Sequence, residues 1–343
     1  MNAPDRAAWL NARKSGIGGS DIAAVLGLSP YRSAVDVWMD KSGRAPAQEE
    51  SEAMYWGTVL EDVVAHEYQK RTGNKVQRLN KMVRHPEHDW MIANLDRLVA
   101  QDGKAPYVAK TGEIRTKHLL ECKTASAYKA QEWGAEGDAD TVPVGYVAQA
   151  MWYLAVTGAQ IIDVACLIGG QRYVQKRIER DEDTIAGMIS KARVFWHENV
   201  LSDIPPEATS GEDVAALFPQ DTGAMVEANA KTLELMARAQ DMKAQIKALE
   251  LELDGDKKRG ILGVTGSLKT FMGEASGIQL GGLVLATWKK AADSQKTNWK
   301  QAADDLKAWA IEEDIPDGVE AIRDIINSNT TTQAGSRRLI IKE

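Results

Sequence analysis

The N-terminal part of the chain alternates between helical and strand-like patterns of apolar and polar residues, with glycines that typically end helices. The expected helices cover residues 20–26, 33–41, 52–72, 143–157 and 184–199. The expected strands cover residues 75–79, 90–100, 117–124, 161–168 and 172–178, with a polar hairpin loop at residues 101–116. The sequence therefore predicts an α/β (α+β) fold in which helices flank a mixed central sheet.

Two adjacent prolines, Pro205 and Pro206, follow this part and precede a run of small and polar residues. Paired prolines and small polar residues end helices, so we expect a domain boundary at this point. The predicted domains are residues 1–205 and an accessory region at residues 206–343.

The accessory region is expected to begin with a long helix over residues 225–253. Its apolar residues repeat at alternating spacings of four and three, which is a heptad-like seam. The seam consists of Leu235, Ala239, Met242, Ile246, Leu249 and Leu253. Because the repeat is short, we favour a helical hairpin, with residues 262–272 returning, over an intermolecular coiled coil. The remaining expected elements are a β-hairpin at residues 278–288, helices at 306–311 and 319–326, and a closing strand at 338–342.

The composition limits the class of protein. The chain has 343 residues and is 44% hydrophobic, which is enough for one sizeable core and a second unit. No apolar run approaches the roughly 20 residues of a membrane helix, and the N-terminus lacks a signal-peptide core. We therefore expect a cytoplasmic protein that does not contact a membrane. Two cysteines, Cys122 and Cys166, suggest no disulfide framework and cannot supply the four thiolates of an iron–sulfur cluster.

The formal net charge of −7 counts mildly against nucleic-acid binding. Two local clusters are nevertheless basic: residues 70–84 carry six Lys or Arg residues and no acid, and residues 172–180 carry four. Such patches can attract phosphates while the rest of the surface stays acidic. The alternative is that they are solvated faces of a helix and a strand.

Three polar residues on neighbouring predicted strands form the central chemical feature. Asp96 lies in one strand, and Glu121 and Lys123 lie in the next. Alternate side chains of a strand share a face, so Glu121 and Lys123 are expected to point the same way while Cys122 points toward the core. Two close carboxylates repel each other and are stabilised by a divalent cation, and Mg²⁺ prefers oxygen ligands. These groups fit hydrolysis of a phosphate ester; the alternative is a structural ion pair between Glu121 and Lys123.

A glycine-rich segment at residues 16–21 follows Arg13 and precedes a predicted helix. Glycines let the backbone approach a ligand closely, and a helix N-terminus favours an anion. Ser20 and Arg13 add a hydroxyl and a guanidinium that suit a phosphate. The alternative is that Ser20 is only an N-cap.

Two further polar residues lie in predicted helices. Glu61 is a candidate metal ligand or proton acceptor, and an exposed helix carboxylate is the alternative. Gln149 lies in an apolar helix and needs hydrogen-bond partners. A phosphate or a base could be one partner, and a neighbouring backbone carbonyl is the alternative.

Five segments occur in an order and spacing that resemble the YqaJ-like viral recombinases, relatives of the phage lambda exonuclease in the PD-(D/E)XK nuclease superfamily. The segments are GIGGSDIAAVLGLSPY, WGTVLED, IANLD, LLECKT and GYVAQAMWYLAVTG. The resemblance covers residues 5–200, and the later ATWKK and GSRRLIIK resemble a C-terminal extension of many YqaJ-type proteins. It implies a PD-(D/E)XK restriction-endonuclease-like core and a phage or prophage origin in a bacterial host cell.

The resemblance implies an exonuclease that degrades one strand of duplex DNA from its 5′ end and leaves a 3′ overhang. A single-strand annealing protein would pair that overhang in recombination. Two Mg²⁺ ions would serve catalysis, and Mn²⁺ would substitute for them. By motif position, Asp96, Glu121 and the Cys122 backbone carbonyl would be metal ligands, Lys123 the catalytic lysine, and Glu61 a helper at the second metal or the water.

The same resemblance implies that Arg13, Ser20 and Gln149 hold the 5′-phosphate. The lambda relative has a further phosphate-binding serine two residues before its aspartate, where this chain has Asn94, whose amide can donate the same kind of hydrogen bond. The family also suggests a homo-oligomer, a ring-shaped trimer around DNA. The segment from residue 206 onward has no counterpart in the lambda enzyme.

Two other functions stay open from the sequence. One is an endonuclease or repair nuclease on the same core, which would cut covalently closed circles. The other is a DNA-binding recombination adaptor without turnover, which would release no nucleotides when Mg²⁺ is added.

Overall fold

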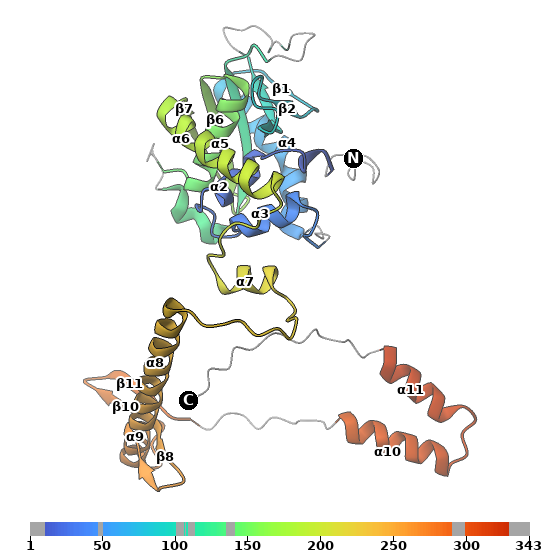
Figure 1. The fold of residues 1–343 in the computed structure, drawn as a ribbon, viewed down its shortest axis with the longest axis vertical. Coiled ribbons are helices and arrows are strands. Elements are labelled where there is room, and N and C mark those ends of the chain that lie inside the picture. The colour runs from blue at the N-terminus through green and yellow to red at the C-terminus, as the bar shows by residue number, and fades with distance from the viewer. Residues whose placement is uncertain are drawn as a thin grey trace. The chain divides into compact units, whose positions relative to one another are not determined.

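A computed structural model describes residues 11–46, 51–100, 106, 108, 114–134, 141–289 and 299–328. The chain divides into two compact units, Met1–Phe218 and Pro219–Glu343 (Figure 1). The first unit extends beyond residue 205 because helix α7 (Gly211–Leu217) contacts α3 (Ala34–Lys41), where the Ser33 hydroxyl lies 2.5 Å from a carboxylate oxygen of Asp213. None of the described helices has the length and apolar character needed to cross a membrane.

A five-stranded mixed sheet is the centre of the first unit, as predicted. Its strand order is β1 (Val76–Arg78), β4 (Arg97–Val99), β5 (His118–Ala125), β6 (Ile161–Ile168) and β7 (Arg172–Glu179). β5 and β6 are parallel over their whole length, and the other neighbours are antiparallel. The long buried strands β5 and β6 therefore provide a rigid platform for side chains on either face.

Helices cover both faces of this sheet. On one face, α4 (Glu52–Thr72) packs Val64, Ala65 and Tyr68 against Leu120 and Cys122 of β5. On the other, α5 (Val144–Thr157) joins the larger core, which also includes α2 (Gly19–Val25) and α6 (Glu182–Val194). Because side chains alternate along β5, Glu121 and Lys123 lie on the α5 face, and the predicted orientation is confirmed.

The predicted strand over residues 90–100 is wrong as a single element. Its first half is β3 (Ile92–Ala93), which pairs with β2 (Val83–Arg84), and its second half is β4. The break has a physical cause at Asp96, whose Oδ2 accepts the Cys122 N–H at 2.8 Å. A side chain thus occupies the place that a backbone carbonyl would take in a continuing ladder.

The end of the predicted helix at residues 184–199 also differs. The helix begins at Glu182, because the Asp181 side chain accepts the Thr184 N–H at 2.7 Å and caps it. It ends as α6 at Val194 and continues as a wider π-helical segment, Phe195–Leu201. The predicted hairpin loop at residues 101–116 lies mostly outside the described residues, apart from an antiparallel bridge between Val108 and Ile114.

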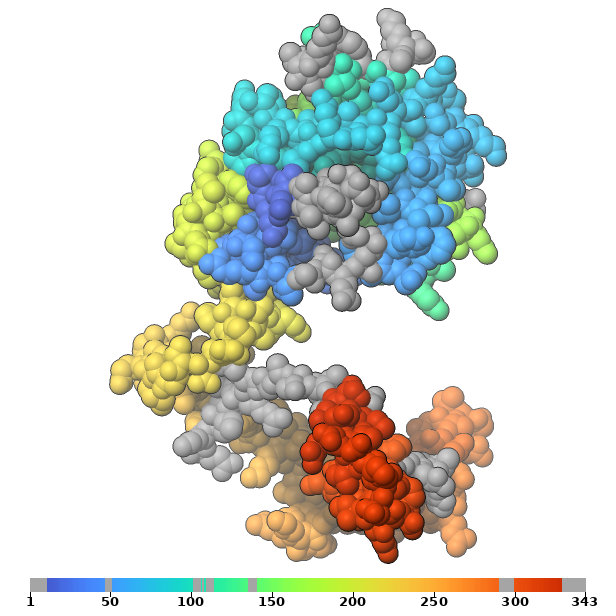
Figure 2. All heavy atoms as spheres, turned by 90° about the vertical axis from the view of Figure 1, so that its right-hand side faces the viewer, coloured from blue at the N-terminus to red at the C-terminus, as the bar shows by residue number. Residues whose placement is uncertain are grey.

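The second unit contains helices and two small hairpins. α8 (Ala230–Asp254) begins later than predicted because the Asn229 side chain accepts the Thr232 N–H at 2.9 Å and caps it. β8 (Gly255–Asp256) and β9 (Ile261–Leu262) lead into α9 (Val264–Met272), and β10 (Gly277–Leu280) pairs with β11 (Leu283–Thr287). α10 (Trp299–Glu312) and α11 (Gly318–Ser328) pack against each other (Figure 2). The predicted closing strand at residues 338–342 lies outside the described residues.

A buried carboxylate, Asp163 of β6, ties α4 and the sheet together. It accepts hydrogen bonds from the Tyr68 hydroxyl at 2.7 Å, His118 Nε2 at 2.8 Å and Arg177 Nε at 2.9 Å. Burial alone would raise the pKa of Asp163, but these donors outweigh it and lower that pKa from 3.8 to about 2. Arg177, a member of the basic cluster at residues 172–180, therefore has a structural partner.

We expect Asp163→Asn to lower the free energy of unfolding by about 2 kcal/mol, because it removes the buried charge that accepts hydrogen bonds from Tyr68, His118 and Arg177. Urea denaturation at neutral pH measures this loss. The matched control is Asp203→Asn, since Asp203 pairs with Arg44 at the surface. This substitution should lower the free energy of unfolding by less than about 1 kcal/mol.

The same carboxylate predicts a pH dependence. A native pKa below the unfolded value stabilises the fold above pH 4, and this stabilisation, about 2 kcal/mol for a shift from 3.8 to about 2, is lost as the pH falls through that range. Asp163→Asn should remove that part of the acid sensitivity. An unchanged acid transition in the variant would contradict the assignment.

Candidate active site

The site begins where β4 and β5 pair. Arg97 lies opposite Leu120 and Leu98 opposite Leu119, so the same register continued by one residue brings Asp96 beside Glu121. The hydrogen bond from Cys122 N to Asp96 Oδ2 fixes the aspartate in this place. The two carboxylates that the sequence separates by an intervening loop therefore lie side by side.

Glu121 is the buried centre of this site, with 4% of its surface exposed. Its Oε1 accepts hydrogen bonds from Lys123 Nζ at 2.7 Å and from Gln149 Nε2 at 2.6 Å. Its other oxygen, Oε2, is buried and has no hydrogen-bond partner among the described residues. A buried carboxylate oxygen without a donor is costly, so this atom is the one in the site that most needs a further cation or donor.

Lys123 is held in place by three groups. Besides Glu121, its Nζ donates to Gln149 Oε1 at 3.0 Å and lies 4.9 Å from the centroid of the Tyr146 ring. Burial alone would lower the pKa of Lys123, but the charges of Glu121 and Asp96 outweigh it and raise that pKa above the ordinary value. The side chain is therefore a fixed ammonium rather than a base.

Gln149 of α5 connects the catalytic candidates to α2. Its amide takes part in hydrogen bonds with Glu121, Lys123 and the Tyr153 hydroxyl, the last at 3.0 Å. Its partners are therefore side chains of the site, and not the backbone carbonyl that was the alternative. Sequence reasoning missed Tyr153, although it lies one helical turn after Gln149 on the same face.

Gly19 of the N-terminal glycine-rich segment lies where helices α2 and α5 approach each other closely. A Cβ added there would lie 2.3 Å from Tyr153 Cε1 and 3.0 Å from Gln149 Cγ. Only glycine lets α2 approach α5 this closely. Through this contact, the segment that contains Arg13 and Ser20 reaches the side of the site formed by Tyr153, and the Arg13 charge acts on the Tyr153 hydroxyl.

Arg13 and Ser20 form a pair, with Arg13 Nη2 donating to Ser20 Oγ at 2.7 Å. The alternative that Ser20 is an N-cap is wrong, because the N-cap is Gly18 and Ser20 lies inside the helix. The N–H of Gly18 is already bonded to the buried carboxylate of Asp21, which also pairs with Lys41 at 2.6 Å. The Ser20 side chain is exposed and is available to a ligand.

Glu61 of α4 lies close enough to Asp96 for its charge to affect it. Its carboxylate pairs with Arg97 Nη1 at 2.5 Å and lies 3.5 Å from Arg78, a member of the basic cluster at residues 70–84. Burial, then the charges of Glu121 and Glu61, raise the pKa of Asp96 well above its ordinary value. Arg97, which sequence reasoning missed, pairs with Glu61 and also donates to the backbone carbonyl of Asp96 at 2.6 Å.

Asn94 lies half-buried two residues before Asp96, within the break between β3 and β4. Its role in binding a phosphate stays a prediction.

The oxygen atoms of this site suit a hard cation. No group of three or more His, Cys, Asp or Glu side chains arranged to hold a metal occurs in the part of the chain that the structure describes. Mg²⁺, however, commonly uses only one or two carboxylates and retains several waters. Two carboxylates share the single ammonium of Lys123, Glu121 Oε2 has no hydrogen-bond partner among the described residues, and the pKa of Asp96 is raised. The residues present therefore fit such an ion.

A family profile and a relative of known sequence both relate this chain to YqaJ. The profile of the YqaJ-like viral recombinase domain matches residues 8–160. The chain is 36% identical over 277 residues to the protein YqaJ of Bacillus subtilis, an alignment that covers 76% of this chain and 80% of that relative. Because this alignment is longer than residues 8–160, the likeness to YqaJ extends beyond the matched domain.

Two solved structures are similar to this chain at lower sequence identity. An alkaline exonuclease from Laribacter hongkongensis has 24% identity and a TM-score of 0.45, with 57% of this chain and 93% of that chain covered. A phage-related exonuclease from Haemophilus somnus has 11% identity and a TM-score of 0.41, with 55% of this chain and 96% of that chain covered.

Proposed function

We propose that this chain, which belongs to the YqaJ-like viral recombinase family, is a metal-dependent exonuclease that digests linear duplex DNA from an end. The observation that carries the proposal is the buried Glu121, which lies beside Asp96 and Lys123 and whose second oxygen has no hydrogen-bond partner in the part of the chain that the structure describes. Its first unit would be a nuclease core of the PD-(D/E)XK type, in which the strand pair β4–β5 presents the acidic residues.

Asp96, Glu121 and the backbone carbonyl of Cys122 would hold Mg²⁺, with Glu61 assisting a second ion, and Mn²⁺ would replace either. When bound, these ions polarise the phosphodiester and lower the pKa of the attacking water. Lys123 donates a proton in a hydrogen bond to that water or to the phosphoryl oxygens, and so stabilises the charge that develops there. Its permanent ammonium charge suits this role better than proton abstraction.

Gln149 positions this machinery. Its amide bonds both Glu121 and Lys123, so that it fixes the distance between the acid and the ammonium. Rigid positioning of this kind is a large part of catalysis, because misplacement by an ångström is costly. Gln149 also bonds Tyr153 beside Gly19, and thereby couples the centre to the place where a DNA end would bind.

The DNA end would be recognised by Arg13 and Ser20, assisted by Asn94 and Gln149. A guanidinium paired with a hydroxyl offers several donors to a terminal 5′-phosphate. Digestion would then proceed from 5′ to 3′ and leave a 3′ overhang for a single-strand annealing protein in recombination. A ring-shaped trimer around the DNA is the assembly that we propose for processive digestion.

We expect Lys123→Ala to lower the rate of nucleotide release from end-labelled linear duplex with Mg²⁺ by at least about 100-fold, since one charge-stabilising donor is worth this much. DNA binding should be largely retained. The matched control is Lys191→Ala, an exposed lysine of α6 that should leave the rate unchanged.

Covalently closed circles decide between the two kinds of nuclease in the same assay. The unmodified protein should release nucleotides only from linear duplex and only with Mg²⁺. Cutting of circles would make it an endonuclease. No release from either substrate, together with DNA binding, would make it an adaptor without turnover.

The proposed binding of a 5′-phosphate by Arg13 and Ser20 predicts that the protein digests 5′-phosphorylated duplex faster than 5′-hydroxyl duplex. Arg13→Ala should reduce the ratio of rates on 5′-phosphorylated and 5′-hydroxyl duplex by about 10-fold, which is the effect of one charge-assisted hydrogen bond. Single-turnover digestion of the two labelled substrates measures the ratio. Arg44→Ala, at an exposed pair with Asp203, is the control. Equal rates on both ends with the unmodified protein would refute this binding.

A further inference from the structure

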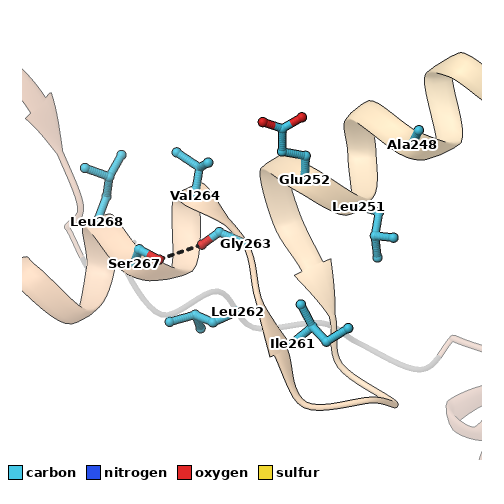
Figure 3. A pocket seen from close by; sticks show the side chains of 9 residues that line it. All are labelled: Ala248, Leu251, Glu252, Ile261, Leu262, Gly263, Val264, Ser267 and Leu268. Atoms are coloured by element: carbon cyan, nitrogen blue, oxygen red, sulfur yellow. Dashed lines mark hydrogen bonds between the residues drawn. The ribbon is translucent and has the colours of Figure 1, made fainter.

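Helix α8 of the second unit has apolar residues on two opposite sides. Ala248 and Leu251 lie on the side that faces α9, where they line a pocket with Ile261 and Val264 (Figure 3). α9 is short and returns only beside the C-terminal turns of α8. α9 therefore packs against a small part of α8, and the other side of α8 is not covered by α9.

The other side of α8 is the heptad-like seam, which consists of Leu235, Ala239, Met242, Ile246, Leu249 and Leu253. No residue of α8 is buried in the described structure. The five large side chains of the seam are 55%, 51%, 53%, 65% and 51% exposed in chain order. A continuous apolar stripe on one helix, left in water, is a surface that another helix covers favourably.

The spacing of the seam selects the kind of partner. Steps of four and three alternate through all six positions, so that the pattern repeats every seven residues, which is the repeat of a left-handed two-stranded coiled coil. The seam is about 27 Å long at 1.5 Å per residue. A helix with the same repeat and the same length is present in every copy of this chain.

We propose that α8 pairs with α8 of a second copy as an antiparallel two-stranded coiled coil. Reversing the seam on itself places each apolar position against another: Leu235 against Leu253 of the partner subunit, and Met242 against Ile246 of the partner subunit. The match is complete because the steps of four and three read the same in both directions. This inference does not depend on the proposed nuclease activity. Because a two-fold pair cannot use all three helices of one ring, α8 helices would pair between chains of different rings.

Charges beside the seam favour this orientation over the parallel one. The antiparallel pair places Arg238 near Glu252 of the partner subunit, twice by symmetry, and Lys243 near Lys243 of the partner subunit once. A parallel pair would instead place Arg238 near Lys243 of the partner subunit twice. Opposite charges at these flanking positions set the partner's direction, so the antiparallel arrangement is preferred.

Disulfide trapping tests the register in the full chain, whose own Cys122 and Cys166 are buried. Leu235→Cys and Leu253→Cys chains with tags of different mass are co-expressed and oxidised mildly. We expect a covalent heterodimer, and no dimer from either variant alone, because a disulfide needs Cα atoms within about 7 Å. Cross-linking of Leu235→Cys by itself, or no cross-link in the mixture, would overturn the proposal.

A polar substitution tests the energetics by sedimentation. Ile246→Glu should weaken self-association through the second unit at least about 10-fold, since it puts a charge in the apolar seam. Leu233→Glu is the matched control, because Leu233 is 57% exposed on the opposite side of α8. Circular dichroism checks that both variants stay helical. Equal effects of the two substitutions, or no effect of Ile246→Glu, would contradict the seam as the interface.

Discussion

The carboxylate of Glu121 is a charge buried between a sheet and a helix, and the surrounding arrangement follows from the cost of that burial. One oxygen is compensated by Lys123 and Gln149, whereas the other has no partner among the described residues. Asp96 beside it increases the negative charge. A protein core rarely keeps such a pair without a use, because replacing either acid would relieve the repulsion. The divalent cation that we propose would supply the missing counter-charge at this site.

The fold holds this unfavourable group through rigid neighbours. α4 anchors the opposite face of β5 through Val64 and Tyr68, and the Asp163 network fixes α4 to the sheet. α5 brings Gln149 over the acid, and the missing side chain of Gly19 lets α2 approach α5. The packed core therefore offsets the cost of burying Glu121, and the exposed Ser20 and half-buried Arg13 lie closer to the surface.

Strand periodicity was sufficient to predict the sheet and to place Glu121 and Lys123 on one face, because alternation is a local property. The depth of Glu121 was not predictable, since it depends on how α5 packs over β5. The break at Asp96 was missed because a side chain replaces a backbone acceptor there, which no hydrophobic pattern records. α7 was missed because it directly follows the prolines and small polar residues that indicate a domain boundary. The seam of α8 was visible in the sequence, but its exposure was not.

Binding of a divalent cation tests the central claim most directly, without reference to DNA cleavage. Titration calorimetry with Mg²⁺ or Mn²⁺, together with thermal unfolding, compares the unmodified chain with Glu121→Gln. Glu132→Gln, which neutralises a surface acid paired with Lys129, is the control. We expect the unmodified chain and the control to bind the ion and to gain about 2.7 kcal/mol of stability at a hundredfold excess over Kd, and Glu121→Gln to lose both. Equal binding by all three chains would contradict the account.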